Sequence, residues 1–170
     1  DNEGKEKLIE ADKIVIATGS EPVPLPNIEF DEKIILSSTG ALNLNEVPKK
    51  MVVVGGGYIG LEMGSVWSRL GSEVHVIEFL DHITPGMDKE ISNEFMKILK
   101  KQGITFHMQH KVEKITKDKS GAIISTSDQS GNKKNFECDV VLISVGRRPN
   151  TRGLNLEKIS IELDEEKRIK

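Results

Sequence analysis

The chain has 170 residues, of which 36% are hydrophobic and 30% are charged, so it can build a folded core beneath a soluble surface. Its formal net charge of −3 and its lack of a long apolar run exclude a basic nucleic-acid-binding protein and a membrane-spanning one. With one cysteine, Cys138, and a polar beginning that lacks a signal-peptide pattern, the sequence favours a cytoplasmic location.

The first 44 residues predict a strand and a connector ahead of the main domain. Residues 13–19 join a β-branched run to a glycine, which indicates a buried strand. Three prolines at alternate positions follow within residues 21–26, and because proline cannot donate a hydrogen bond to a sheet, they indicate an extended connector. Residues 37–43 begin with hydroxyl side chains that can cap a short helix. We expect the main domain to span residues 45–150.

A strand, a glycine-rich turn and a helix open this domain. Residues 51–54 are apolar and mostly β-branched, and three glycines follow them directly. The next residues repeat apolar side chains at helical spacing, and Gly71 then provides a stop, so we predict a helix over residues 58–70. The apolar face of this helix is expected to consist of Ile59, Met63, Val66, Trp67 and Leu70.

The alternation of strand and helix continues along the chain. Residues 73–78 predict a second strand and residues 104–108 a third. Between them, Asp88 is suited to cap a helix over residues 89–101. This helix is expected to bury Ile91, Phe95, Ile98 and Leu99. The β-α-β-α-β order indicates half of a doubly wound parallel sheet.

The helical period disappears after residue 110. Residues 111–117, 122–127 and 133–137 predict three short strands, joined by turn-forming residues. Residues 139–146 predict one more buried strand, and residues 151–170 are charged and expected to be peripheral. We therefore predict an α/β fold with a Rossmann-like parallel sheet, in which an antiparallel three-stranded β-meander replaces the last crossover helix.

The glycines after the first main-domain strand match the G-x-G-x-x-G pattern of dinucleotide-binding proteins. Gly55 allows the sharp turn, Gly57 leaves room for a pyrophosphate beside the backbone, and Gly60 lets the helix pack closely on the strand. The N-terminus of the helix adds free N–H groups and partial positive charge. Because the pattern has a strand before it and a helix after it, it predicts a dinucleotide site.

An acidic residue at the end of the next strand indicates which dinucleotide binds. Glu78 lies 18 positions after Gly60, and a carboxylate there can accept hydrogen bonds from both hydroxyls of an adenosine ribose. It would repel a 2′-phosphate, and no cation follows until Lys89. The sequence therefore favours NAD over NADP, although Glu78 could instead only face solvent at the strand end.

Other candidate residues carry less information. Tyr58 or Ile59 could touch the nicotinamide or simply pack against the protein. Cys138 has no activating partner nearby in sequence, so we interpret it as a core residue. The histidines at 75, 82, 107 and 110 do not have the spacing of a compact zinc motif, and we expect no metal site.

Several stretches of the chain carry a resemblance to a known family. They lie at residues 16–20, 37–42, 55–62, 64–67, 69–71, 76–80 and 146–149. Through them the chain resembles, over nearly its whole length, the dihydrolipoyl dehydrogenases. These are the flavoproteins of 2-oxo-acid dehydrogenase complexes and belong to the class I pyridine nucleotide–disulfide oxidoreductases. The resemblance implies the NAD-binding domain of such an enzyme.

The resemblance also implies roles for individual residues. The NAD pyrophosphate and nicotinamide would be approached by Gly55, Gly56, Gly57, Tyr58, Ile59, Gly60, Leu61 and Glu62. Glu78 would bind the adenosine ribose, Val112 would contact the adenine end and Gly146 the nicotinamide end. Thr18, Gly19 and Ser20 match a loop that touches FAD in the family.

The family's redox disulfide and its histidine–glutamate acid–base pair have no counterpart in this sequence. The resemblance therefore implies a fragment without catalytic residues, in which residues 1–44 retain a strand of an FAD domain and residues 151–170 lead to an interface domain. FAD would belong to the full-length parent only. The parent would be a homodimer that serves the lipoyl domain of a 2-oxo-acid dehydrogenase complex, in the mitochondrial matrix if eukaryotic. We expect the fragment itself to be a monomer.

Two other interpretations remain open. The parent could be an NAD(P)H-dependent disulfide reductase of the same family, although Glu78 argues against NADPH. The chain could also be a stand-alone dinucleotide-binding module with no redox role. The motif at residues 16–20 argues instead for a piece of a larger enzyme.

Overall fold

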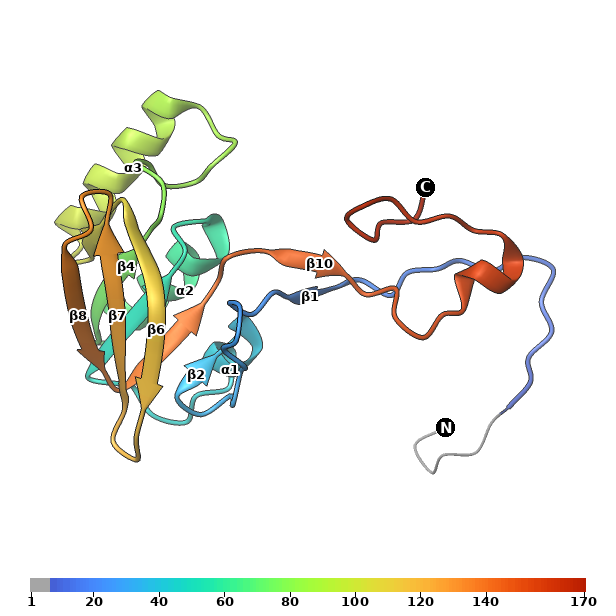
Figure 1. Ribbon diagram of the computed structural model, residues 1–170, viewed down its shortest axis with the longest axis horizontal. Coiled ribbons are helices and arrows are strands. Elements are labelled where there is room, and N and C mark those ends of the chain that lie inside the picture. The colour runs from blue at the N-terminus through green and yellow to red at the C-terminus, as the bar shows by residue number, and fades with distance from the viewer. Residues whose placement is uncertain (1–6) are drawn as a thin grey trace. The chain divides into compact units, whose positions relative to one another are not determined.

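The computed structural model describes residues 7–170, which divide into two compact units (Figure 1). One unit is Pro22–Arg147, and among the described residues the other combines 7–21 with Arg148–Lys170. Residues 1–6, part of the predicted segment 1–44, lie outside the described residues. The domain boundaries that we expect at residues 44 and 150 remain predictions.

A five-stranded parallel sheet forms the centre of the larger unit. Its strands run in the order β2 (Ile35–Leu36), β9 (Val140–Ile143), β3 (Lys50–Val54), β4 (Glu73–Ile77) and β5 (Thr105–His107). The chain enters the sheet at the outer strand β2, and the carboxyl ends of the parallel strands lie together at one end of the sheet. Val54 of β3 lies opposite Ile77 on one side and Ile143 on the other. This arrangement confirms the predicted Rossmann-like sheet.

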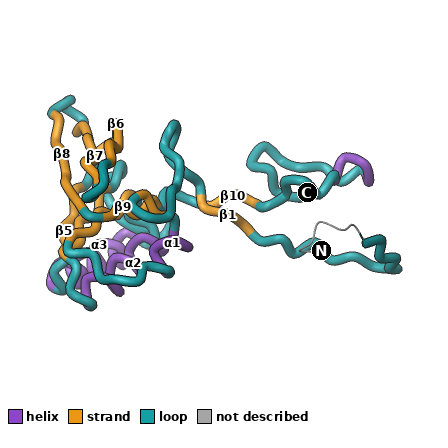
Figure 2. The backbone as a smooth tube through the Cα atoms, turned by 90° about the horizontal axis from the view of Figure 1, so that it is seen from below, coloured by secondary structure: helices purple, strands orange, loops and turns teal. Residues whose placement is uncertain are grey.

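The two faces of the sheet carry different layers (Figure 2). One face packs against α1 (Ser38–Leu42), α2 (Tyr58–Arg69) and α3 (Lys89–Lys101). The other packs against the antiparallel meander of β6 (His110–Lys117), β7 (Ala122–Asp128) and β8 (Lys133–Cys138). The alternation of side chains along a strand produces this division. In β3, Val53 joins the helical core, whereas Val52 and Val54 join the core beneath the meander.

The meander confirms the predicted replacement of the last crossover helix. Its two turns are each organised by an aspartate whose side chain accepts backbone N–H groups of the turn. Asp118 accepts from Ser120 at 2.7 Å and Gly121 at 3.1 Å, and Asp128 accepts from Ser130 at 2.8 Å. Asp88 likewise caps α3 as predicted, because its side chain accepts the N–H groups of Glu90 and Ile91.

The predicted strand over residues 13–19 is wrong. Residues 13–18 are not in a strand, and Ile14 and Val15 are 80% and 86% exposed. Only β1 (Ser20–Pro22) pairs here, with β10 (Arg147–Pro149). Among residues 7–170, no strand lies beside residues 13–18, so their apolar side chains have nothing to pack against. The smaller unit also contains a 3₁₀ helix, Leu156–Ile159.

The predicted buried faces of the two long helices are also partly wrong. In α3 the buried residues are Ser92 and Leu99, while Ile91 and Ile98 are more than half exposed. In α2 the buried residues are Gly60, Leu61, Gly64 and Trp67, and Val66 and Leu70 are exposed. Both helices bury small residues beside their large ones, Gly60 and Gly64 in α2 and Ser92 in α3, and the predicted apolar faces did not include them.

Candidate functional site

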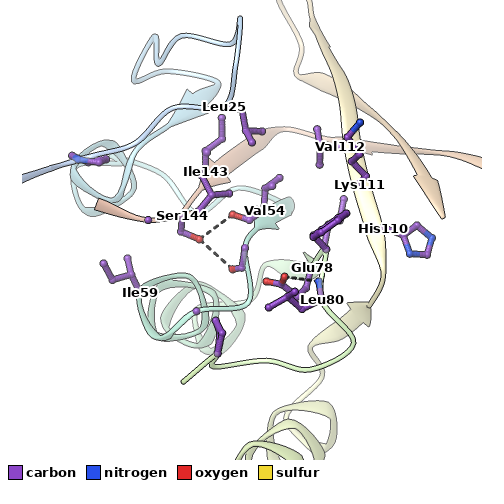
Figure 3. A pocket seen from close by; sticks show the side chains of 18 of the residues that line it. Leu25, Val54, Ile59, Glu78, Leu80, His110, Lys111, Val112, Ile143 and Ser144 are labelled. Carbon is purple, nitrogen blue, oxygen red and sulfur yellow. Dashed lines mark hydrogen bonds between the residues drawn. The ribbon is translucent and has the colours of Figure 1, made fainter. Parts of the chain in front are cut away.

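A large cavity lies where the carboxyl ends of β3, β4 and β9 meet (Figure 3). Its volume is about 980 Å³, at the upper end of the range for small-molecule sites. In open parallel sheets this edge is where ligands bind. The glycine turn and the start of α2 form one wall, and the first residues of β6 form another. All of its lining residues belong to the larger unit.

The glycine turn is shaped by close backbone contacts. Gly55 has a φ of +106°, and a Cβ there would lie 2.5 Å from the carbonyl oxygen of Ser144. A Cβ at Gly60 would lie 2.4 Å from both the Gly55 carbonyl oxygen and Ser144 Oγ. Any larger residue at either position would therefore push the turn away from β9 or α2 away from β3. Both glycines are required by packing within the protein.

Gly57 differs from the other two motif glycines. A Cβ at this position would meet no protein atom within 4 Å, so packing within the protein does not require a glycine there. Gly57 lines the cavity and is the N-cap of α2, and no side chain caps the helix. The first N–H groups of a helix have no partner within it. The turn therefore leaves open space and backbone donors at the same point.

Ser144 connects the turn to β9, and the sequence analysis did not identify it. Its hydroxyl lies 3.1 Å from the Val54 carbonyl oxygen and 3.2 Å from the Gly55 carbonyl oxygen (Figure 3). Its backbone N–H donates to the Val54 oxygen at 2.8 Å. The residue follows a buried strand on a different segment from the motif, so only the pairing of β3 with β9 reveals its role.

Glu78 is the buried acid of the cavity, with 8% of its surface exposed. Its Oε2 accepts the backbone N–H of Gly56 at 2.6 Å, and its Oε1 accepts that of Leu80 at 2.8 Å. Its own backbone bonds to His107 and His110, which fixes the residue at the end of β4. The interpretation that Glu78 only faces solvent is therefore wrong. A carboxylate held in this way keeps acceptor capacity on both oxygens.

The expected cofactor residues separate into three groups. The first lines the cavity and consists of Gly55, Gly57, Tyr58, Ile59, Glu78, Val112 and Gly146. The second lies beneath or beside it: Gly56 donates to Glu78, Gly60 and Leu61 are buried in the packing of α2, and Glu62 is exposed. The third group, Thr18, Gly19 and Ser20, belongs to the smaller unit.

Tyr58 is 71% exposed, so it does not serve as ordinary packing. Other cavity residues come from segments that the sequence analysis did not connect with the site. They are residues 25–28, the loop around Thr84 and Pro85, and Lys111. Lys111 is a cation of the same cavity as Glu78 that the local sequence around Glu78 could not reveal, and its Nζ lies 3.4 Å from Glu113.

The loop of Thr18, Gly19 and Ser20 has an ordered setting within the smaller unit. Thr18 Oγ1 donates to the Asn150 carbonyl oxygen at 2.6 Å, and the Asn150 N–H donates to the Gly19 oxygen at 3.0 Å. Next to it, Arg148 and Arg152 both pair with Glu21 at 2.7 Å. These arginines hold the pKa of the Glu21 carboxyl below its usual range. The pairs join the two chain segments that form this unit.

Cys138 lies in the core beneath the meander, as predicted. Burial raises the pKa of its thiol to about 11, so it is protonated at neutral pH and is not a nucleophile. Within residues 7–170, no three histidine, cysteine or acidic side chains gather in a metal-binding arrangement. In the same part of the chain, no helix is both long and apolar enough to cross a bilayer.

Comparison with known proteins places this geometry in a family. The family model described as pyridine nucleotide-disulphide oxidoreductase matches residues 1–170. The chain is 57% identical to dihydrolipoamide dehydrogenase of Chaetomium thermophilum over 99% of the chain and 34% of that protein. It is 52% identical to the mitochondrial dihydrolipoyl dehydrogenase of Dictyostelium discoideum over 99% of the chain and 35% of that protein.

Solved structures of the same kind are also similar. The HOCl-induced flavoprotein disulfide reductase RclA of Escherichia coli has a TM-score of 0.78 at 31% identity, covering 93% of this chain and 35% of that one. LpdA of Mycobacterium tuberculosis has a TM-score of 0.77 at 27% identity, covering 88% and 32%. The chain thus spans about a third of the length of the relatives that it matches. It belongs to the pyridine nucleotide–disulfide oxidoreductase family.

Proposed function

We propose that this chain is the NAD-binding part of a dihydrolipoyl dehydrogenase, and that its cavity positions NAD⁺ to accept a hydride from reduced FAD in the parent enzyme. The observation that carries the proposal is the buried carboxylate of Glu78, held by two backbone N–H groups inside a cavity at the carboxyl ends of parallel strands. The high identity to proteins named dihydrolipoyl dehydrogenase supports the assignment to this branch.

The pyrophosphate end of the site would lie at the glycine turn. Gly57 presents open space where a side chain would otherwise stand, and α2 begins there without a side-chain cap. Free N–H groups and the positive end of the helix dipole stabilise a bound anion at such a position. Gly55 and Gly60 hold this turn against β9, so the donors are fixed before a ligand arrives. Fixed donors lower the entropic cost of binding.

The ribose end would lie at Glu78. Each of its carboxylate oxygens already accepts one N–H, which fixes the plane of the group and leaves acceptor sites for two hydroxyls. We propose that the 2′- and 3′-hydroxyls of the adenosine ribose donate to these oxygens. Val112, on the opposite wall, would then contact the adenine. Hydrogen bonds to a charged acceptor contribute about 1.5–3 kcal/mol each.

The nicotinamide end would lie at Gly146 and the first residues of α2. Tyr58 and Ile59 line the cavity here together with Gly146, and Tyr58 is exposed enough to move aside. The bound nicotinamide supplies the hydride-accepting carbon. The protein's contribution is to bind the two nucleotides at fixed points and so orient this ring toward the flavin of the parent.

The same carboxylate would discriminate between NAD and NADP. A 2′-phosphate at the ribose would place about two negative charges beside a buried carboxylate. Lys111 lines the cavity, but its Nζ is paired with Glu113. We therefore propose that the site prefers NAD. A calorimetric titration with NADH and NADPH tests this, because equal or tighter binding of NADPH would contradict the NAD assignment and favour a disulfide reductase that uses NADPH.

The activity of the whole protein is part of the same proposal. In the parent, electrons would pass from dihydrolipoamide through a disulfide and FAD to NAD⁺, and Thr18, Gly19 and Ser20 would contact FAD. Residues 45–150 would form the NAD-binding domain, with FAD and interface domains in the rest of the parent chain. The parent would be a homodimer that accepts the lipoyl domain of a 2-oxo-acid dehydrogenase complex. Several relatives are named as mitochondrial, which supports a matrix location if the source is eukaryotic.

The 170-residue chain itself should bind NAD without turning over lipoamide, because it has one cysteine and that thiol is buried. Size-exclusion chromatography should show a monomer.

A further inference from the structure

Four ionisable side chains on three strands form a continuous hydrogen-bonded chain that the proposed NAD site does not use. Glu73 and His75 lie on β4, His107 on β5 and Lys134 on β8 of the meander. Glu73 Oε1 is 2.6 Å from His75 Nε2, and His75 Nδ1 is 3.0 Å from His107 Nε2. His107 Nδ1 is 3.5 Å from Lys134 Nζ. The chain thus links the edge of the parallel sheet to the meander.

Aromatic contacts shield the middle of this chain. The two imidazole rings are nearly parallel, with centroids 5.3 Å apart, and the Phe136 ring lies 4.5 Å from that of His107. Lys134 Nζ lies 4.9 Å from the centre of the same Phe136 ring. The side chain of His75 is only 16% exposed. Phe136 therefore holds His107 and Lys134 in place and limits the access of water.

The identities of the two end groups determine every proton position in the chain. Glu73 is a carboxylate and can only accept, so His75 carries a proton on Nε2. A neutral His75 then has a lone pair on Nδ1, which accepts from Nε2–H of His107. His107 is left with a lone pair on Nδ1, and the ammonium of Lys134 can only donate to it. All three contacts are satisfied only when both imidazoles are neutral.

We propose that Glu73, His75, His107 and Lys134 form a proton-sensitive clasp, which holds β8 to β5 while both imidazoles are neutral and releases Lys134 when either imidazole gains a proton. A proton added to Nδ1 of His107 faces the Lys134 ammonium directly. A proton added to Nδ1 of His75 faces Nε2–H of His107, so His107 must move its own proton to Nδ1, where it again faces Lys134. Both routes break the same contact.

The charges around the clasp favour the closed form. Burial, and then the positive charge of Lys134, lower the pKa of His107 to about 4. His110 on β6 lies edge-on to the His107 ring at 6.0 Å, and Asp128 on β7 faces His110. At the other end, Lys50 on β3 lies 3.3 Å from Glu73 and, together with His75, keeps Glu73 ionised. By the His107 route, the clasp therefore opens only as the pH falls toward 4.

Nuclear magnetic resonance tests the clasp in the intact chain. At pH 7.5 the imidazole nitrogen spectra should show His75 and His107 as Nε2–H tautomers. On acidification, the backbone amides of residues 134–136 should shift with the same midpoint as the His107 ring. In a solvent of high dielectric constant, an ammonium 3.5 Å away lowers the pKa of an imidazole by about one unit. Lys134→Met should therefore raise the midpoint of the His107 titration by about that amount.

Lys133→Met is the matched control, because Lys133 is the neighbouring exposed lysine of β8. Within residues 7–170, it is Lys134 and not Lys133 that contacts His107. It should leave the His107 midpoint unchanged. An Nδ1–H tautomer at either histidine would overturn the proposal, as would a His107 midpoint that Lys134→Met does not move or that both variants move equally. None of these readouts depends on NAD binding, so they are independent of the proposed function.

Discussion

The two ends of β4 each carry a glutamate, and the two glutamates are held in opposite ways. Glu78 follows the carboxyl end, is 8% exposed and bonds to backbone N–H groups at 2.6 and 2.8 Å. Glu73 lies at the amino end, its side chain is 59% exposed, and it pairs with Lys50 and His75. Backbone donors cannot leave their positions, whereas exposed side chains exchange their partners with water. The difference predicts that substitutions at the carboxyl end change binding and stability, and that those at the amino end change little.

The largest effect is expected where the carboxyl end has no free space. Gly60→Ala would place a Cβ 2.4 Å from the Gly55 carbonyl oxygen and from Ser144 Oγ, so the turn must move. Overpacking of this kind costs about 1–3 kcal/mol, and we expect urea denaturation to show a loss of stability of about 2 kcal/mol. Gly64→Ala is the control on the same helix, because its Cβ would lie 3.3 Å from a Val74 methyl and should cost less. Equal costs for both variants would contradict this reading of the turn.

A smaller effect is expected from the pH dependence of stability. Burial lowers the pKa of His107 to about 4 in the folded chain, from 6.5 when unfolded. The unfolded chain therefore binds the proton first, so this stability is fully present above pH 6.5 and is lost as the pH falls from 6.5 to 4. Because His107 is partly exposed, we discount the full shift to about 1–2 kcal/mol.

Urea denaturation at pH 7.5 and 4.5 measures this loss. His107→Gln should lose less stability than the parent chain between the two pH values. His82→Gln serves as the control, since His82 pairs with exposed Asp81 at the surface. If the parent chain and His107→Gln respond equally to pH, His107 is not the group that titrates.

The smallest effect is expected at the amino end of β4. Glu73→Gln removes the charge that pairs with Lys50 at the surface, and surface ion pairs contribute about 0–1 kcal/mol. The glutamine oxygen can still accept from His75 Nε2, so the clasp stays closed. We expect the denaturation midpoint at pH 7.5 to stay close to that of the parent chain. A loss as large as that of Gly60→Ala would erase the contrast between the two ends.

The sequence predicted correctly those elements whose conformation is specified by residues close together along the chain. The run Met51–Val54, the motif glycines and the cap Asp88 each specify their own conformation, and the structure has the strand, turn and helix that they imply. The meander was predicted for the same reason, because its turns are built by Asp118 and Asp128 from their own neighbours.

What the sequence could not show depends on partners that are distant along the chain. Residues 13–19 have the sequence pattern of a buried strand. Within the described part of the chain, however, no strand pairs with residues 13–18. Ser144 and Lys111 reach the cavity only because β9 and β6 bring them there. In α3, the hydroxyl of Ser92 faces inward to bond with Thr84 at 2.7 Å, which turns Ile91 outward. Tertiary packing therefore determines which of these residues are buried or line the cavity, and the periodicity of the sequence does not.

The most direct test of the account is a calorimetric titration of NAD⁺ and NADP⁺ into the parent chain, Glu78→Gln and Glu73→Gln. Both oxygens of Glu78 accept N–H groups, so the amide of a glutamine would face one of these donors and could not serve both ribose hydroxyls. We predict that the parent chain binds NAD⁺ more tightly than NADP⁺. Glu78→Gln should bind NAD⁺ at least about tenfold more weakly and lose the preference, while Glu73→Gln keeps both. Unchanged NAD⁺ affinity in Glu78→Gln would contradict the central claim.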